Sequence, residues 1–357
     1  MGKISKFILI TVIFIFSILI VSSLVGFSIL SKNPGARMLL IQGGYLSPDR
    51  ALKEEIKVTV DGIQVPVYHY HTRSPSDRYY VFIHGLTPLG YKHPALNDLA
   101  KALVDATGMH VFIPDFTHYV RKNRNMDSIK KGVSGIYMKL QDTYPGKYRG
   151  FGSCIGGSIL MNSMLEVARG KVPEKIFLYG PYNHGKGLVP LLQAAAKQNN
   201  KNTDLDFLVR LTLSSRNEYF NDREKKLIEK AMLSTSPGLT DETKMRRILG
   251  KDLFRNISIF KFTHDDMKIM DVKTKNISEH LAATRFYIIH SKNDRLIPFQ
   301  QGKNLAEVLK VDGLNVSFVG TEIFSHSKNK ISVTGIYNEA RYLVDFFNEL
   351  FEGDIAY

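Results

Sequence analysis

The chain opens with an apolar stretch that has no counterpart further along. Residues 7–30 contain no charged side chain, and about 20 apolar residues suffice for a helix to cross a membrane. A cleaved signal peptide has an apolar region of about 7–15 residues followed by a small-residue cleavage site, which only the 24–28 neighbourhood weakly resembles. We predict a membrane anchor at residues 1–30, with its helix at 7–30.

The basic residues beside this stretch indicate an orientation. Lys3, Lys6 and the amino terminus precede the apolar run, and Lys32 and Arg37 follow it. The excess of positive charge on cytoplasmic flanks weakly favours a cytoplasmic amino terminus. We therefore expect a single-pass membrane protein whose body lies on the extracytoplasmic side.

Beyond a short stalk at 31–53, strand-like and helix-like patterns alternate. Two β-rich runs, 56–60 and 64–70, flank Asp61-Gly62, a pair that supplies the positive φ angles of a tight turn and so predicts an antiparallel hairpin. Strands are then predicted at 79–84, 110–115, 148–154, 175–179, 285–290 and 315–319. Helices are predicted near 95–106, 126–140, 155–168 and 300–310 and at the carboxyl end. This alternation is typical of a mostly parallel sheet covered by helices, an α/β fold.

One long stretch interrupts the alternation. From about residue 181 to 283 the sequence is charged and helix-favouring, and the strand pattern returns only at 285. We interpret this stretch as an inserted helical cap. The expected organisation is therefore a first core segment at 54–182, a cap at 183–283 and a second core segment at 284–357.

Composition excludes several classes of protein. The 357 residues are 44% hydrophobic and 23% charged, which is ordinary globular usage. The single cysteine excludes an internal disulfide and a cysteine-rich metal or iron–sulfur site. The net charge of +14 favours anionic surfaces, but no nucleic-acid motif and no phosphate-binding glycine loop is present. We predict neither a nucleic-acid partner nor a nucleotide cofactor.

The segment 152–157 (GSCIGG) carries the strongest chemical signal, because it lies where a predicted strand turns directly into a predicted helix. A nucleophile on such a turn is held above the sheet by a strained backbone, and small residues two positions away on either side relieve crowding. Gly152 and Gly156 occupy those positions, Gly157 follows, and Cys154 is at the tip. The helix start favours a thiolate there. The alternative is that Cys154 is a small buried apolar residue.

Partners for this nucleophile appear later in the chain. Asp294 lies in a turn after the strand that begins at residue 285, and His326 follows the last predicted strand. A base for the thiol and an acid to orient that base are what a nucleophile of this kind requires. For the oxyanion hole we predict the N–H groups of Ile155, which follows Cys154, and of Leu86, in the loop after the strand 79–84. Two donors are expected, because losing one raises the barrier by ~3 kcal/mol.

On these motifs the chain resembles the α/β-hydrolase superfamily from roughly Glu54 to Tyr357. The matching features are the His84-Gly85 loop, the strand-to-helix turn at 152–157 (the nucleophile elbow), the Asp-x-x-x-Pro loop at 294–298 and His326 near the carboxyl end. Most similar proteins carry serine where this chain has Cys154. Dienelactone hydrolases resemble it in using cysteine, and polyester synthases have a similar G-x-C-x-G-G box. The resemblance implies an α/β-hydrolase fold with an inserted cap, and the segment 114–118, where many relatives have a glycine-rich turn, leaves the substrate class open.

The expected activity is cleavage of an ester or thioester by a Cys154–His326–Asp294 triad through a covalent acyl-enzyme. Because a thiolate leaves more readily than an unactivated alkoxide, thioesters and activated esters should react best. Acyl transfer to another nucleophile on the same triad is the alternative within enzymes. A non-catalytic hydrolase-fold protein that binds a ligand is the alternative from another class.

Two histidines raise the question of a metal. His69 and His71 alternate along a predicted strand and face the same side, but the sequence shows no third ligand. We therefore predict no metal and no cofactor. The expected partners are a small-molecule or lipid-like acyl substrate and the membrane, and the oligomeric state is left open.

Overall fold

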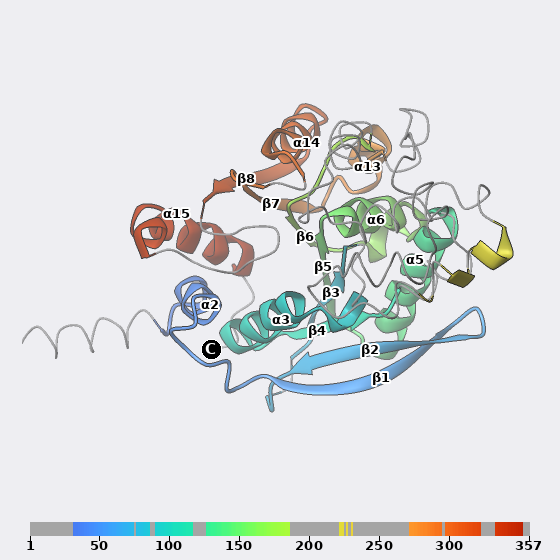
Figure 1. Ribbon diagram of the computed structural model, residues 1–357, viewed down its shortest axis with the longest axis horizontal. Coiled ribbons are helices and arrows are strands. Elements are labelled where there is room, and N and C mark those ends of the chain that lie inside the picture. The colour runs from blue at the N-terminus through green and yellow to red at the C-terminus, as the bar shows by residue number, and fades with distance from the viewer. Residues whose placement is uncertain are drawn as a thin grey trace, which may run out of the picture.

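The computed structural model describes residues 31–74, 76–85, 90–116, 126–185, 221–224, 226–227, 230, 271–294, 297–322 and 333–352. Within these residues the chain forms an eight-stranded sheet in the order β1-β2-β4-β3-β5-β6-β7-β8, flanked by helices on both faces (Figure 1). The α/β class with a mostly parallel sheet is therefore confirmed.

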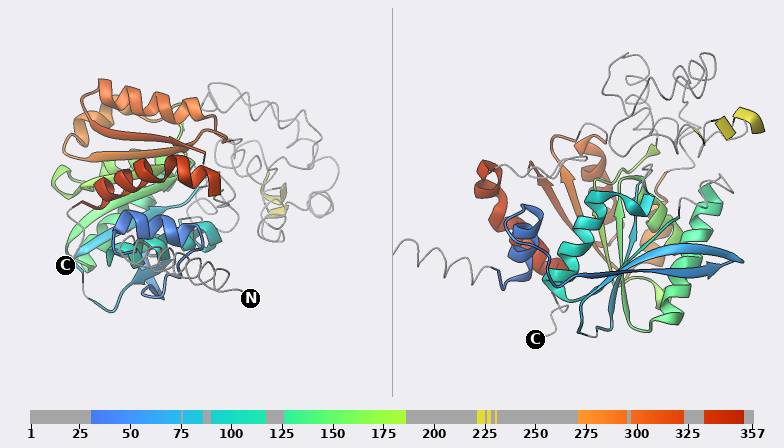
Figure 2. Two further views of the ribbon diagram at one scale, coloured as in Figure 1. Left: turned by 90° about the vertical axis from the view of Figure 1, so that its left-hand side faces the viewer. Right: turned by 60° about the horizontal axis from the view of Figure 1, so that its bottom comes forward.

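The sheet begins with the expected hairpin. Strands β1 (Leu52–Val60) and β2 (Ile63–His71) pair antiparallel, with Val60 opposite Ile63. The two turn residues both have positive φ, 50° at Asp61 and 74° at Gly62, as a type I′ turn requires. The hairpin lies along one edge of the sheet, drawn in blue in Figure 2.

The remaining strands form the parallel part of the sheet. They are β3 (Arg78–Ile83), β4 (His110–Pro114), β5 (Lys147–Ser153), β6 (Lys175–Tyr179), β7 (Arg285–Ser291) and β8 (Asn315–Thr321). From β3 the chain moves outward to β4 and then returns to place β5 on the other side of β3. This reversal makes the carboxyl ends of β3 and β5 the topological switch point, where open α/β sheets bind their ligands.

Helices cover the two faces separately (Figures 1 and 2). One face carries α2 (Pro34–Gln42), α3 (Pro94–Thr107) and α15 (Val333–Phe351), which share a buried cluster with the sheet. The other carries α5 (Met126–Thr143), α6 (Ile155–Ser163), α13 (Thr274–His280) and α14 (Phe299–Val311). Three short 3₁₀ helices lie at Gly90–Lys92, Met164–Glu166 and Arg169–Lys171.

Alternation along the strands explains the two faces. In β3, Tyr80 and Phe82 belong to one buried cluster, and Val81 and Ile83 belong to the other. The predicted apolar face of α5 packs in the second cluster through Ile129, Val133, Ile136, Tyr137 and Leu140, each at most 1% exposed. A sheet buried on both faces is what near-continuous apolar strands predict.

The segment 31–53, expected as a stalk, contains helix α2 packed on the body. Met38 is fully buried against the face formed by α3 and α15. Arg37 forms an ion pair with the buried Asp105 of α3, whose other carboxylate oxygen accepts a 2.8 Å hydrogen bond from the Arg50 N–H. The chain is therefore fixed to the body from about residue 34 onward, because apolar packing and a buried charge pair both hold α2.

Two predicted parts of the chain lie outside the described residues. They are the anchor helix at 7–30 and most of the cap at 183–283. Among the helices that the structure does describe, none has the length and apolar character needed to cross a membrane.

Candidate active site

Cys154 sits on a sharp turn between β5 and α6. Its backbone has φ 54° and ψ −131°, and among the described residues only Cys154 and Asp61 have positive φ without being glycine. The Cys154 N–H donates a 2.9 Å hydrogen bond to the Tyr179 carbonyl oxygen of β6, and the side chain is 7% exposed. A conformation of this kind costs about 1–3 kcal/mol and is retained where the surrounding structure fixes it, commonly at functional sites.

The glycines around this turn are required by close packing. A Cβ on Gly152 would lie 2.4 Å from the Gly157 Cα atom, because β5 and the first turn of α6 are in backbone contact. A Cβ on Gly156 would lie 2.4 Å from the carbonyl oxygens of Ile83 and His84. The GSCIGG segment thus lets the helix start directly beneath the carboxyl end of β3.

The loop after β3 passes against the turn. A Cβ on Gly85 would lie 3.2 Å from the Cys154 Cβ and 3.8 Å from its Sγ, so the Gly85 backbone is a direct neighbour of the thiol. The buried His84 ring stacks on Phe116 at 3.8 Å, and its Nδ1 donates a 2.7 Å hydrogen bond to the Gly85 carbonyl oxygen. His84 therefore fixes the Gly85 carbonyl, in the loop where the Leu86 N–H was expected as an oxyanion donor. This role was not predicted from the sequence.

The two predicted oxyanion donors differ in what the structure says of them. Ile155 is the first residue of α6, and the N–H groups of a first helical turn have no acceptor within their own helix. Leu86 lies outside the described residues.

Asp294 follows β7 at the same carboxyl edge of the sheet. Its side chain is 1% exposed, and its Oδ1 accepts a 2.9 Å hydrogen bond from the Ile297 N–H. The buried His290 lies with Nε2 3.4 Å from the Asp294 Oδ2 and donates a 2.9 Å hydrogen bond to the Ile297 carbonyl oxygen. His290 thereby fixes the turn from Asp294 to Ile297, called the acid turn below. A histidine at the end of the predicted strand 285–290 was the signal that could have identified it.

Tyr179 connects the acid turn to the elbow. Its carbonyl oxygen holds the Cys154 N–H, and its pKa is raised by burial and further by the Asp294 carboxylate. Tyr182, three residues later and fully buried, is a neighbour of Ser158 and Cys154; burial raises its pKa as well. These two tyrosines come from the segment after β6, which carried no recognisable motif.

A carboxylate on α15 binds the carboxyl end of β8, shortly before His326 in the sequence. Glu339 is 6% exposed and accepts hydrogen bonds from the Thr321 hydroxyl at 2.5 Å and the Glu322 N–H at 2.9 Å, at the end of β8. Lys292, two residues before Asp294, lies 3.4 Å from the same carboxylate. Burial opposes ionisation of Glu339, but these hydrogen bonds outweigh it and lower its pKa. Glu339 thus joins the ends of β7 and β8.

His326 itself lies outside the described residues, four positions beyond Glu322. The structure therefore brings Cys154, Asp294, Ile155 and the elbow glycines to one edge of the sheet. Among described residues, a group with metal-ligand spacing occurs elsewhere, at Glu54, His69 and His71.

Comparison with known proteins adds information at the level of the fold. No family model matches the chain, and no curated protein matches it by sequence. Similar solved structures include carboxyl esterase 2 from the fungus Tuber melanosporum, at 14% identity, with 86% of this chain and 87% of that chain covered and a TM-score of 0.53. They also include a thermostable esterase from Pseudomonas putida, at 13% identity, with 90% of each chain covered and a TM-score of 0.51.

Both similar structures are named esterases, and both identities are too low to carry more than the fold. The strand order, the antiparallel second strand and the turn at Cys154 agree with that likeness. The body of this chain has the α/β-hydrolase fold.

Proposed function

We propose that this protein is a hydrolase of ester or thioester acyl bonds that uses Cys154 as its nucleophile. His326 is its base, Asp294 orients that base, and the N–H groups of Ile155 and Leu86 bind the oxyanion. The single observation that carries the proposal is the strained Cys154 backbone, with φ 54°, at the strand-to-helix turn. A cysteine with only a packing role would have no need of this conformation, which costs free energy. The two similar structures named above are both esterases, which supports the same reaction class.

The proposed reaction has two steps. His326 takes the proton from the Cys154 thiol as sulfur attacks the acyl carbon, and the leaving group departs with that proton, which leaves a thioester on Cys154. His326 then takes a proton from water, the hydroxide attacks the thioester carbon, and the thiol re-forms as the acid is released. When the first tetrahedral intermediate collapses, the Cys154 thiolate leaves more readily than an unactivated alkoxide, and the substrate is then re-formed. Thioesters and activated esters are therefore the preferred substrates, because their own leaving groups compete with Cys154. In acyl transfer, an acceptor alcohol or amine takes the place of water.

The test uses the purified full-length protein with matched acyl thioesters and nitrophenyl esters, beside the variants Cys154→Ala and Cys154→Ser. We expect the parent to release the acyl group about a hundredfold or more faster than Cys154→Ala, since positioned proton transfer alone contributes about 10²–10⁴. Mass spectrometry of quenched reactions should show one acyl adduct. Its position is unambiguous because the chain has one cysteine.

Two results would contradict the proposal. Full activity in Cys154→Ala would exclude the thiol as nucleophile. A parent protein that forms no acyl adduct, and whose cysteine reacts with iodoacetamide no faster than a free thiol, would favour the non-catalytic binding protein. Product analysis with an added alcohol or amine acceptor separates hydrolysis from acyl transfer.

The proposal includes a single-pass anchor at residues 7–30, an extracytoplasmic body and a lipid-like acyl substrate. Its support is the run at 7–30, which contains no charged residue and is long enough to cross a membrane. Because α2 begins at Pro34 and is held to the body by Arg37 and Asp105, a membrane helix ending at residue 30 would keep the body close to the membrane. Parent protein should stay with membranes after alkaline extraction. A variant with Ile15→Arg and Leu19→Arg should be released, because each central arginine costs about 2.5–3.5 kcal/mol. Recovery of the parent in the soluble fraction would refute the anchor.

A further inference from the structure

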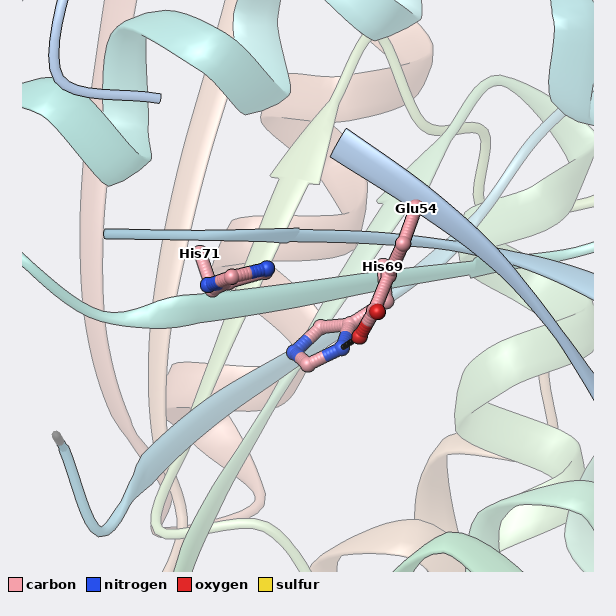
Figure 3. Close-up of side chains that lie close together, drawn as sticks. All are labelled: Glu54, His69 and His71. Atoms are coloured by element: carbon pink, nitrogen blue, oxygen red, sulfur yellow. Dashed lines mark hydrogen bonds and ion pairs between the residues drawn. The ribbon is translucent and has the colours of Figure 1, made fainter. Parts of the chain in front are cut away.

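A second group of chemically active side chains lies at the amino edge of the parallel strands, opposite the edge that carries Cys154. His110 is the first residue of β4, whereas Cys154 follows the last residue of β5. Next to His110, donor atoms of Glu54, His69 and His71 lie within 4.8 Å of one another (Figure 3). The acyl chemistry proposed above uses none of these four residues.

The hairpin register explains how they meet. Glu54 of β1 is paired with His69 of β2, so their side chains share one face of the sheet. His71, two residues after His69, faces the same side because side chains alternate along a strand. The sequence offered two histidines without a third ligand, and the antiparallel pairing supplies Glu54 from a position 15 residues earlier.

His69 is buried and hydrogen-bonded to Glu54. The residue is 4% exposed, and its Nδ1 lies 2.6 Å from the Glu54 Oε1. Since a carboxylate accepts, His69 Nδ1 carries the proton and Nε2 presents its lone pair. A metal ion can displace this proton, because ligand nitrogens must be deprotonated and metal binding releases the protons that they carry.

Two further histidines lie beside this pair. His71 Nδ1 donates a 2.9 Å hydrogen bond to the Thr72 carbonyl oxygen, which leaves its Nε2 as an acceptor. The His110 ring stacks on His69 at 5.0 Å, and its Nδ1 lies 2.8 Å from the His69 Nε2. The His110 Nε2 is buried and has no hydrogen-bond partner among the described residues. Three imidazole rings and one carboxylate are therefore gathered at this edge of the sheet.

We propose that Glu54, His69 and His71 form a binding site for a divalent transition-metal ion, with Zn²⁺ as the ion that this donor set fits. Imidazole nitrogens and a carboxylate oxygen are zinc ligands, and three protein ligands suffice for a zinc site. The ion takes the place of the proton between the His69 Nδ1 and the Glu54 Oε1, and the His69 Nε2 keeps its 2.8 Å hydrogen bond with the His110 Nδ1. Glu54, whose side chain is 51% exposed, has its second carboxylate oxygen to offer. The metal would join β1 to β2 at the edge of the sheet.

The test is a Zn²⁺ titration of chelator-treated full-length protein against a chromophoric competitor. We expect one ion per chain and an affinity that falls tenfold or more in His71→Ala and in Glu54→Gln. His184→Ala is the matched control, because His184 is exposed and lies outside the cluster, and its affinity should equal that of the parent. Addition of Co²⁺ should give visible d–d bands that His71→Ala loses.

Stability supplies a second readout that does not depend on activity. An ion that binds only the folded chain raises the melting temperature in proportion to the logarithm of its concentration, and the His71→Ala variant should lose most of this increase. Zinc affinity in His71→Ala and Glu54→Gln equal to that of the parent would overturn the proposal. Failure of the parent to bind Zn²⁺ at micromolar concentrations would also overturn it. Neither substitution touches a fully buried side chain, so both variants should fold, whereas a change of His69 itself could unfold the chain.

Discussion

The Cys154 N–H donates its hydrogen bond to the Tyr179 carbonyl oxygen, and burial together with the nearby Asp294 carboxylate raises the pKa of the Tyr179 side chain. One residue at the end of β6 therefore contacts the turn that carries the nucleophile and lies beside the turn that carries the acid. The two turns are 140 residues apart in sequence (294 − 154) and become neighbours only because β5, β6 and β7 are consecutive in the sheet.

The strained turn predicts that glycine is more stable than alanine at position 154, the reverse of the usual order in a helix. Glycine adopts positive φ without strain, so Cys154→Gly should be more stable than Cys154→Ala by about 1 kcal/mol. In thermal unfolding the glycine variant should melt about 2–4 °C higher. The control is Ala106→Gly in α3, which should lower stability by about 1 kcal/mol. If glycine proves less stable than alanine at both positions, residue 154 is not strained.

The contact of α6 with the end of β3 predicts that Gly156 tolerates no side chain. Gly156→Ala places a Cβ 2.4 Å from two backbone oxygens and should cost about 1–3 kcal/mol, with loss of acyl release because α6 shifts. Gly170→Ala is the matched control, since no atom lies within 4 Å of its added Cβ. Urea unfolding of both variants checks the prediction. Equal midpoints would show that the helix can move away from β3 without cost.

Glu339 predicts a dependence of stability on pH. Its pKa is lower in the folded chain than in the unfolded chain, so the unfolded chain binds more protons as the pH falls below the ordinary value of 4.5. The stability that Glu339 contributes is therefore complete at neutral pH and is lost in acid. Between pH 5 and pH 3 the urea midpoint should fall less in Glu339→Gln than in the parent. The variant should also release acyl groups more slowly, because Glu339 holds the end of β8. An identical pH dependence in both proteins would remove Glu339 from this role.

Lys175 predicts a stabilising contact at the end of the last helix. Its ammonium group donates hydrogen bonds of 2.8 to 3.2 Å to the carbonyl oxygens of Glu349, Leu350 and Glu352. Burial lowers the pKa of Lys175 to about 8, with Arg149 and Arg285 nearby adding to the effect. Lys175→Met removes this donor from all three carbonyl oxygens, of which the Glu349 oxygen still accepts from the Tyr287 hydroxyl, and should cost about 2 kcal/mol.

The matched control for Lys175 is Lys171→Met. Lys171 pairs with Asp142 at 3.4 Å on the surface, where such a pair contributes about 0–1 kcal/mol. Chemical unfolding should therefore separate the two variants clearly. Similar losses in both would mean that the helix end is satisfied by water.

Much of the fold could be predicted from sequence because its determinants are local. Asp61-Gly62 specified a type I′ turn, the period of α5 specified its buried face, and strand β6 was predicted at the bounds that the structure gives. The glycines at 152, 156 and 157 likewise indicated a close strand-to-helix turn, since their absence of side chains permits backbone contact at any such turn.

Other features depend on which strands become neighbours, and no local pattern contains that information. The pairing of Glu54 with His69 follows from the hairpin register, the bond between His290 and the acid turn follows from a loop that folds back, and Glu339 reaches β8 from the next helix. The sequence by itself determined the eight strands, most of the helices and the position of Cys154, but not helix α2. Only the tertiary structure decided which side chains orient the acid, which join β7 to β8, and that Glu54 lies beside two histidines, because these contacts join segments that are separated along the chain and adjacent in the sheet.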